Sequence, residues 1–292
     1  MAAEWVRDDR TARPGAAPAP APASEVFYRH RFLVRLTHWI NALAIFVLVG
    51  SGLNIFNAHP QLYWGLKGSE FDAPVLAIRA APIAGAMHGL LTVGGLTIDT
   101  TGVLGWSNSI GRMAQAFPSW ITIPGPVDLA DARHWHFFFA RILVANGLVY
   151  LGWSLLSRHL QRDLWPTLGD LRAIPRSMLD HLRLRHPRGE AAKRYNVLQR
   201  LAYLGLIVCV VGMVVTGLSM SPGFNAVAPW LLEVVGGRQS ARTLHFIFAG
   251  LIVAFILIHL IEVVLAGPVN EVGSMITGRY RVDPDHLGGE ER

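Results

Sequence analysis

The stretch HFIFAGLIVAFILIH, residues 245–259, decides the fold of this chain because it contains no Asp, Glu, Lys or Arg. At a rise of about 1.5 Å per residue, a helix of this stretch and its apolar flanks would cross a hydrocarbon core of about 30 Å. His245 and His259 stand at its two ends. At about 100° per residue, the two imidazoles point to within about 40° of each other. The stretch therefore predicts a transmembrane helix with a histidine near each membrane surface.

The composition agrees with a membrane protein. Hydrophobic residues make up 52% of the chain and charged residues 16%, which is unusual for a water-soluble globular protein. Four segments are long and apolar enough to span a bilayer, and we expect helices at residues 36–56, 137–157, 201–220 and 243–266. The predicted fold is an all-α membrane protein, a four-helix transmembrane bundle.

Residues 80–98 also lack formal charge and leave a fifth helix as an alternative. Four glycines and a proline in this segment lower its helix propensity. A fifth crossing would also put the most basic loop on the side opposite the basic N-terminal region. We therefore expect an ordered external loop between the first two helices.

The basic residues predict the orientation, because loops rich in Lys and Arg stay on the cytoplasmic side. Residues 158–200 hold ten Lys and Arg, whereas the long segment 57–136 holds four and residues 221–242 hold two. Both termini should therefore be cytoplasmic, with the long loop on the other side. Residues 1–24, rich in Ala and Pro, should form a disordered cytoplasmic tail, 25–282 the membrane domain and 283–292 a second tail. The net charge of +6 is then mostly a matter of topology, and no nucleic acid is expected as a partner.

Two further histidines lie at matching depths. His38 is at the cytoplasmic start of the first helix, level with His259, and His136 is at the outer start of the second helix, level with His245. Paired neutral imidazoles across an apolar bundle suit the two axial positions of a haem b. We predict an inner haem held by His38 and His259 and an outer haem held by His136 and His245, about 20 Å apart.

An arginine stands three residues before three of these histidines, where it could meet haem propionates at the membrane surface. These are Arg35, Arg133 and Arg242. Other interpretations remain open. A histidine near a helix end is often only an interfacial or hydrogen-bonded residue. The chain could also be a transporter or proton relay that uses intramembrane His and Glu, or a structural anchor.

Several motifs resemble a known family, the bacterial di-haem cytochrome b subunits of the nickel-iron hydrogenase and formate dehydrogenase type. The chain looks especially similar to the thiosulfate reductase cytochrome b branch, whose partners are molybdopterin-dependent oxidoreductases. The resemblance covers about residues 27–281 and rests on RLTHW (35–39), DTTGVLG (99–105), RHWHFFFA (133–140), RYNVLQRLAY (194–203), GRQSARTLH (237–245) and GPVNEVGSMITGRY (267–280). One departure is His134, where similar sequences carry an arginine.

The resemblance implies a function as well as ligands. It carries haem ligation over to His38, His136, His245 and His259, and it implies a multi-pass protein of the bacterial inner membrane. Such subunits transfer electrons between an exchangeable quinone and a periplasmic oxidoreductase, so the chain would be a quinone-reactive electron-transfer subunit. Residues expected near the inner haem and the quinone are Glu262, Tyr195, Asn196 and Gln199. Glu262 could relay a proton or could simply be a solvated carboxylate at a helix end. The long loop carries aromatic residues that suit a cap over the outer haem or a docking surface, namely Tyr63, Trp64, Phe71, Trp106, Phe117 and Trp120.

Overall fold

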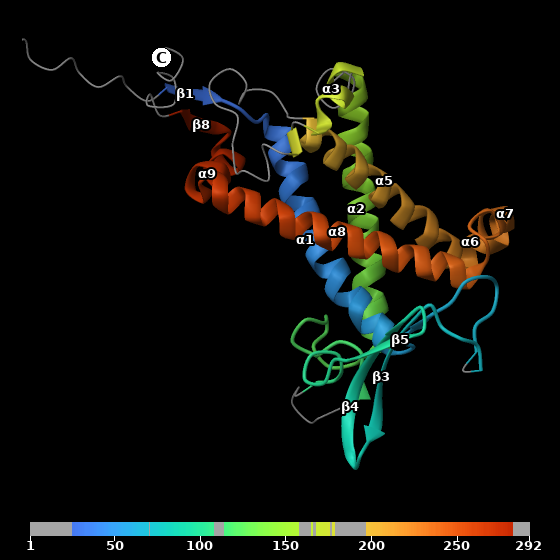
Figure 1. Cartoon of the computed structure of the whole chain (residues 1–292). Helices are drawn as coiled ribbons and strands as arrows, with labels where there is room; N and C mark the ends of the chain where they lie inside the picture. Colours follow the sequence, from blue (N-terminus) through green and yellow to red (C-terminus); the bar gives the residue numbers. More distant parts are fainter. Residues whose placement is uncertain are drawn as a thin grey trace, which may run out of the picture.

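Four long helices dominate the computed structural model, which describes residues 25–69, 71–107, 114–157, 165, 168–175, 177–178 and 197–282. They are α1 (Phe32–Asn57), α2 (Leu129–Leu156), α5 (Val197–Met220) and α8 (Arg238–Ala266) (Figure 1). All four are long and apolar enough to cross a membrane, as predicted. Each begins four to eight residues earlier than expected from hydropathy, because its first turns are helical but contain charged residues.

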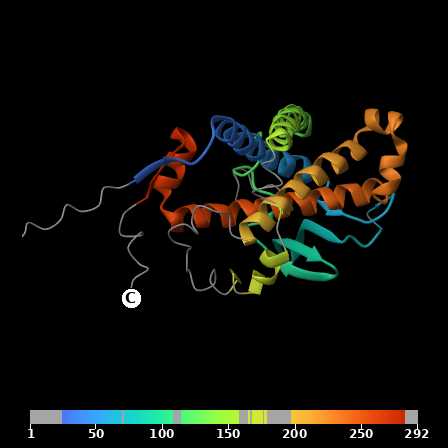
Figure 2. The same ribbon diagram turned by 90° about the horizontal axis from the view of Figure 1, so that it is seen from above.

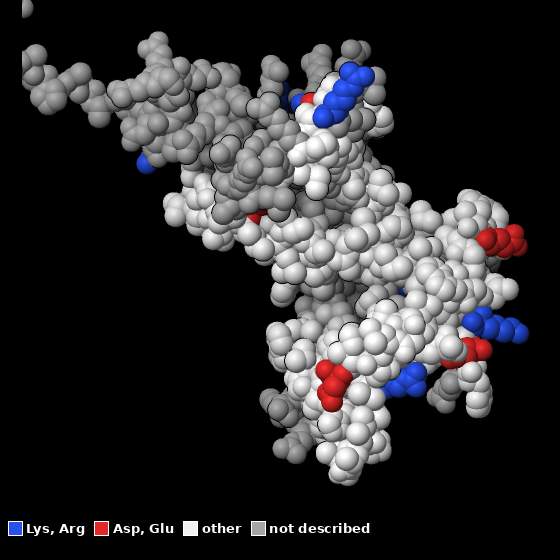
Figure 3. Space-filling view, in the orientation of Figure 1, with Lys and Arg blue, Asp and Glu red and all other residues white. Residues whose placement is uncertain are grey.

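The outside of the helices is apolar. Large side chains such as Phe46, Leu148 and Val208 are 63–70% exposed, as expected for residues that face lipid. On the face drawn in Figure 3, charged side chains lie at the ends of helices and on the sheet, while the middle of α8 is uncharged. This surface suits a protein surrounded by a hydrocarbon layer.

The helices form two antiparallel pairs, α1 with α2 and α5 with α8 (Figures 1 and 2). Between α1 and α2, the buried Asn146 amide donates to Thr37 O at 2.8 Å and to Asn41 Oδ1 at 2.7 Å. Between α5 and α8, Gly212 lies directly beneath the ring of Phe248. A polar bond and a close glycine contact thus hold the two pairs, as is common where helices pack within lipid.

The segment between α1 and α2 is a small β-structure. It contains β2 (Gln61–Leu62), β3 (Leu76–Ile83), β4 (Ala86–Val93) and β5 (Leu96–Asp99) in one antiparallel sheet of that order. A second ladder pairs β6 (Gly105–Trp106) with β7 (Ala114–Gln115). Residues 80–98 therefore do not form a fifth helix. The prediction of an all-α protein is wrong for the segment between α1 and α2, which forms β-strands.

Two tight turns explain why the apolar segment 80–98 forms strands. The β3–β4 turn has Ala84 at φ 49° and Gly85 at 85°, and the β4–β5 turn has Gly94 at 54° and Gly95 at 90°. Two successive residues with positive φ are what two-residue hairpins require. The glycines that argued against a helix are the residues that make these hairpins possible.

The sheet is attached to one end of the bundle. A small core joins Phe56 of α1 to Leu62, Ile78 and Ala116, and Phe246 of α8 packs against it. The buried Asn54 amide of α1 also donates to Pro124 O and Pro126 O at 2.7 and 2.8 Å. The segment from 61 to 126 therefore covers the C-terminal end of α1 and the N-terminal part of α8.

The opposite end of the bundle brings the two ends of the described chain together. Strand β1 (Glu25–Tyr28) pairs antiparallel with β8 (Arg279–Val282), and α9 (Pro268–Thr277) links α8 to β8 (Figure 1). The Trp39 indole of α1 donates to Met275 O of α9 at 3.0 Å. The predicted tails, 1–24 and 283–292, lie outside the described residues.

Three short helices complete the described chain: α3 (Leu168–Arg172), α6 (Pro222–Val227) and α7 (Pro229–Val234). Helix α3 lies in the basic segment 158–200, most of which falls outside the described residues. Helices α6 and α7 form the short connection between α5 and α8.

Candidate functional site

The inner pair of histidines lies between α1 and α8. The ring centroids of His38 and His259 are 6.3 Å apart, and the ring planes are inclined by 72°. Phe255 stacks on His259 at 6.0 Å with an angle of only 4°, and Trp39 contacts His38 edge-on at 5.4 Å. Both imidazoles are thus half-buried among aromatic rings.

The outer pair lies between α2 and α8, beside the end that carries the sheet. The ring centroids of His136 and His245 are 6.2 Å apart, with an angle of 55° between the planes. Each outer ring also contacts a buried hydroxyl. Ser51 Oγ lies 3.1 Å from His136 Nδ1, and Thr216 Oγ1 lies 2.9 Å from His245 Nδ1.

Sequence reasoning missed these two hydroxyl residues. A signal was present, since each immediately precedes a glycine within an apolar helix, at Ser51–Gly52 and Thr216–Gly217. A Cβ added at either glycine would lie 3.4 or 3.5 Å from Cε1 of the corresponding histidine. The same hydroxyl–glycine arrangement therefore supports both outer imidazoles.

The spacing within each pair fits a metal held by two opposed imidazoles. Metal–imidazole bonds of about 2.0–2.1 Å, with roughly 1 Å from each ring nitrogen to its centroid, put two trans rings about 6 Å apart. The observed separations are 6.3 and 6.2 Å. Two ligands alone are too few for a bare metal ion, whereas a haem supplies the four equatorial ligands and needs only two from the protein. The donor set therefore fits haem.

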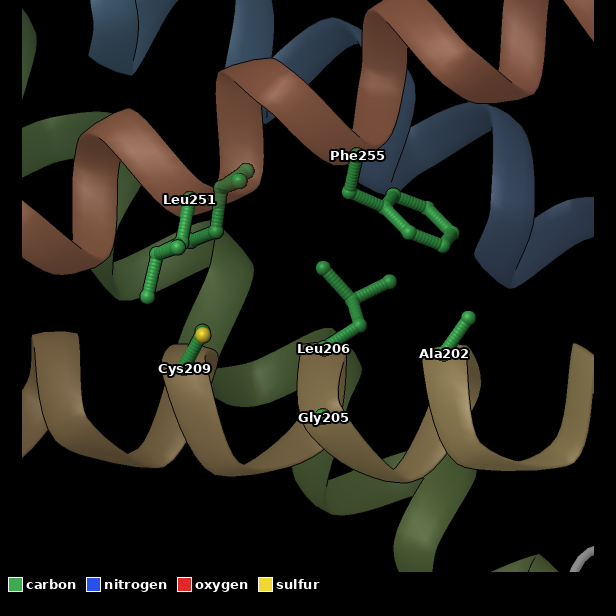
Figure 4. A pocket seen from close by; sticks show the side chains of 7 residues that line it. Ala202, Gly205, Leu206, Cys209, Leu251 and Phe255 are labelled. Carbon is green, nitrogen blue, oxygen red and sulfur yellow. The ribbon is translucent and has the colours of Figure 1, made fainter. Parts of the chain in front are cut away.

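An apolar cavity of about 240 Å³ lies between α5 and α8 (Figure 4). It is lined by Ala202, Gly205, Leu206, Cys209, Leu251, Ile252 and Phe255. Phe255 connects the cavity to the inner pair, because the same ring stacks on His259. Cys209, the single cysteine, is one of the small side chains that line this cavity.

The three arginines do not share one environment. The Arg35 guanidinium donates to Ile276 O at the end of α9, and Arg242 donates to His59 O and to Gln61 O, the latter at 3.1 Å. Arg133 is exposed, and its guanidinium lies 5.6 Å from the Phe137 ring centroid. Two of the three therefore tie helices to neighbouring segments, and a role with haem propionates stays a prediction for all three.

Two residues of the predicted quinone set are described, and Tyr195 and Asn196 lie outside the described residues. Gln199 is exposed in the first turn of α5, and Glu262 is half-buried on α8, one turn beyond His259. Tyr203 of α5 contacts Phe255 of α8, with ring centroids 6.4 Å apart. Gln199 thus lies at the end of the bundle that holds the inner pair.

Four other described histidines lie apart from the pairs, and two of them contact an aspartate. His134 is exposed and lies 3.8 Å from Asp131, whereas His88 Nδ1 lies 2.6 Å from Asp99 Oδ2 at the edge of the sheet. Hydrogen bonds from the Thr101 hydroxyl and backbone N–H, followed by the contact with His88, lower the pKa of Asp99 to about 2. Both histidines thus contact carboxylates outside the two pairs.

Comparison with known proteins identifies the family of the chain. The family described as prokaryotic cytochrome b561 matches residues 29–278. A protein of Azospira oryzae, YedZ1, whose name describes a protein-methionine-sulfoxide reductase subunit, is 28% identical over 243 residues, covering 83% of this chain and 93% of its own length. No solved structure matches the chain. From the match over most of its length, the chain belongs to the prokaryotic cytochrome b561 family and is a multi-pass membrane protein of the haem b electron-transfer type.

Proposed function

We propose that this chain is a di-haem cytochrome b that transfers electrons between the quinone pool and a periplasmic, molybdopterin-dependent oxidoreductase. The observation that carries the proposal is the pair of histidine contacts, 6.3 and 6.2 Å between ring centroids, that α8 makes with α1 at one end and with α2 at the other. The chain would be the quinone-reactive electron-transfer subunit of a respiratory complex.

Haem held by His38 and His259 and by His136 and His245 would supply reversible one-electron chemistry. The residues of the chain hold the two sites apart. His245 and His259 are fourteen residues apart on one helix, which corresponds to about 21 Å along the bilayer normal if the helix is upright. The buried Ile252 lies halfway between them in the sequence and on the same face of α8, so an apolar side chain lies between the two sites.

The orientation follows from charge. The segment 158–200 is the most basic connection, and β1 and β8 bring both ends of the described chain to the end of the bundle with the inner pair. We propose that this end faces the cytoplasm, with both termini inside, and that the sheet and the outer pair face the periplasm of a bacterial inner membrane.

The quinone would exchange at the inner pair. Glu262 and Gln199 lie at that end of the bundle, and Tyr195 and Asn196 are close to Gln199 in the sequence. Quinone reduction or oxidation moves protons as well as electrons, and the Glu262 carboxylate is the residue we assign to relay them. If Glu262→Gln left quinone turnover unchanged at every pH, this assignment would be wrong.

The periplasmic partner would dock on the sheet end. Among the aromatic residues of the 57–136 segment, Phe71 is 98% exposed, Trp120 82% and Trp64 52%, whereas Tyr63 is buried. Exposed aromatic side chains are common anchors of protein interfaces. The name of the Azospira relative, a subunit of a reductase, is in line with a subunit that works beside a catalytic partner. The partner should co-purify with the chain and reoxidise its haems.

The alternative function is a transporter or proton relay. The Asn41–Asn146 contact is the polar interaction that favours it, because it lies among apolar helices. Absence of a haem band in a folded preparation supplied with haem would favour this alternative.

The deciding experiment is a pyridine haemochrome assay on purified protein, together with a reduced-minus-oxidised spectrum. We expect two b-type haems per chain, falling to about one in His38→Ala and in His136→Ala. His134→Ala is the matched control, since His134 is two residues from His136 and 83% of its side chain is exposed, so both haems should remain. Retention of two haems in either ligand variant would contradict the proposed pairing.

A further inference from the structure

The two histidine pairs differ in what surrounds them, although they are alike in spacing. Both outer imidazoles contact a hydroxyl on the neighbouring helix, Ser51 on α1 and Thr216 on α5. In the described part of the chain, His38 and His259 have ring contacts with Trp39, Phe255 and each other, but no hydrogen bond to either imidazole is present. The outer site is therefore the more rigidly built of the two.

The direction of the outer hydrogen bonds follows from counting protons. A hydroxyl has one proton to donate. Ser51 Oγ directs its proton to Val47 O, 2.7 Å away, and Thr216 Oγ1 directs its proton to Gly212 O, 2.6 Å away, in both cases a carbonyl of its own helix. The hydroxyl oxygen is then free to accept a hydrogen bond from the imidazole.

The tautomer of both rings follows. When Nδ1–H donates to the hydroxyl, the lone pair of a neutral imidazole resides on Nε2, the nitrogen that is left to bind a metal. A partner on the second ring nitrogen also fixes ring rotation and raises ligand basicity. Both hydroxyls are almost inaccessible to solvent, Ser51 at 0% and Thr216 at 2%, so water does not compete for the bond.

The adjacent glycines leave room beside the rings. A Cβ at Gly52 or Gly217 would be 3.4 or 3.5 Å from Cε1 of His136 or His245, which is van der Waals distance. Each imidazole edge therefore lies beside a residue without a side chain, while its Nδ1 meets the hydroxyl of the preceding residue. The hydroxyl is thus the polar contact that orients the ring.

We propose that Ser51 and Thr216 are positioning residues of the outer haem, and that each holds its histidine in the Nδ1–H tautomer with Nε2 directed at the iron. This inference rests on the proposed di-haem function. It gives the outer haem two hydrogen-bonded, more basic imidazole ligands, whereas the inner haem has ligands oriented by aromatic contacts.

The test is a redox titration of Thr216→Val, in which valine keeps the shape of the side chain but cannot accept the hydrogen bond. Loss of the bond makes His245 a weaker electron donor, so the oxidised haem is less stabilised. We expect the reduced-to-oxidised ratio of one haem at fixed ambient potential to rise at least threefold, with the other haem unchanged. The altered component should be the one that is lost in His136→Ala.

Matched variants separate positioning from general packing. Ser219 is buried on the same helix and donates to Thr216 O at 2.9 Å without an imidazole contact, so Ser219→Ala should leave both potentials unchanged. Thr216→Ser should restore the wild-type titration, because it retains the hydroxyl. Ser51→Ala makes the same test from α1, which keeps the proposal refutable if Thr216→Val does not fold.

The outcomes distinguish the two levels of inference. Two haems in the wild type, with titrations of Thr216→Val and Ser51→Ala that match Ser219→Ala, would overturn the positioning roles and leave the di-haem function intact. No haem in the wild type would overturn both. A ferric low-spin electron paramagnetic resonance signal that changes in Thr216→Val and returns in Thr216→Ser would support the positioning roles independently of any turnover assay.

Discussion

The buried amide of Asn146 gives a quantitative test of how the α1–α2 pair is held. It makes two interhelical hydrogen bonds, 2.8 Å to Thr37 O and 2.7 Å to Asn41 Oδ1. Interhelical hydrogen bonds in membrane proteins contribute about 0.6 kcal/mol on average and about 1.7 kcal/mol at most. Asn146→Leu should therefore lower the free energy of unfolding by about 1 kcal/mol, the sum of two average bonds.

A double-mutant cycle makes the test sharper. We would measure reversible unfolding in mixed micelles for Asn146→Leu, Asn41→Leu and the double variant, and expect a coupling energy of about 0.6 kcal/mol. Gly147→Ala is the control, because a Cβ there would meet nothing within 4 Å. A coupling energy indistinguishable from zero, with both single variants folded, would refute the hydrogen bond as a contributor to stability.

Two further predictions concern helix packing and the sheet. Gly212→Ala would place a Cβ 2.5 Å from the Phe248 ring, so we expect the free energy of unfolding, measured by thermal denaturation, to fall by about 1–3 kcal/mol. Gly205→Ala would place its Cβ in open space and should leave the free energy of unfolding nearly unchanged. The hydrogen bonds with Thr101 lower the pKa of Asp99 to about 2. These bonds therefore stabilise the β4–β5 region fully at pH values above the ordinary carboxyl pKa of about 3.9, and the stabilisation is lost as the pH falls from there towards 2. As pH falls through that interval, the hydrogen-exchange protection factors of the region should fall, and Asp99→Asn should abolish this pH dependence.

The four spanning helices could be predicted from hydropathy because each presents a long, uncharged run, as residues 245–259 do. The residues at which these helices begin could not be predicted from hydropathy. The first turns of α2, for example, contain polar residues that hydropathy assigns to a loop. The β-hairpins were missed for a related reason. The apolar stretch 80–98 has the hydropathy of a spanning segment. Its glycines and proline argued against a helix, but the positive backbone angles that make two hairpin turns are seen only in the structure.

The histidine pairs could be anticipated from depth alone, because helices that cross the same layer place residues of equal depth side by side. The hydroxyl partners were not anticipated. A serine or threonine within an apolar helix usually bonds to its own backbone, as Ser51 and Thr216 also do, and the glycine that follows each of them was the signal in the sequence for a second role. The carbonyl partners of Arg35 and Arg242 come from distant segments and depend on the tertiary fold.

The pairing of β1 with β8 sets a timing constraint on biogenesis. Strand β1 is made first, yet its partner is the last described element of the chain, more than 250 residues later. At roughly 5–20 residues per second, the ribosome supplies β8 about 13–50 s after β1. During that interval the edge of β1 has no partner strand, and Arg29 lacks Glu271, its ion-pair partner at 3.4 Å. Formation of this ladder therefore marks the moment at which all four helices have been delivered to the membrane.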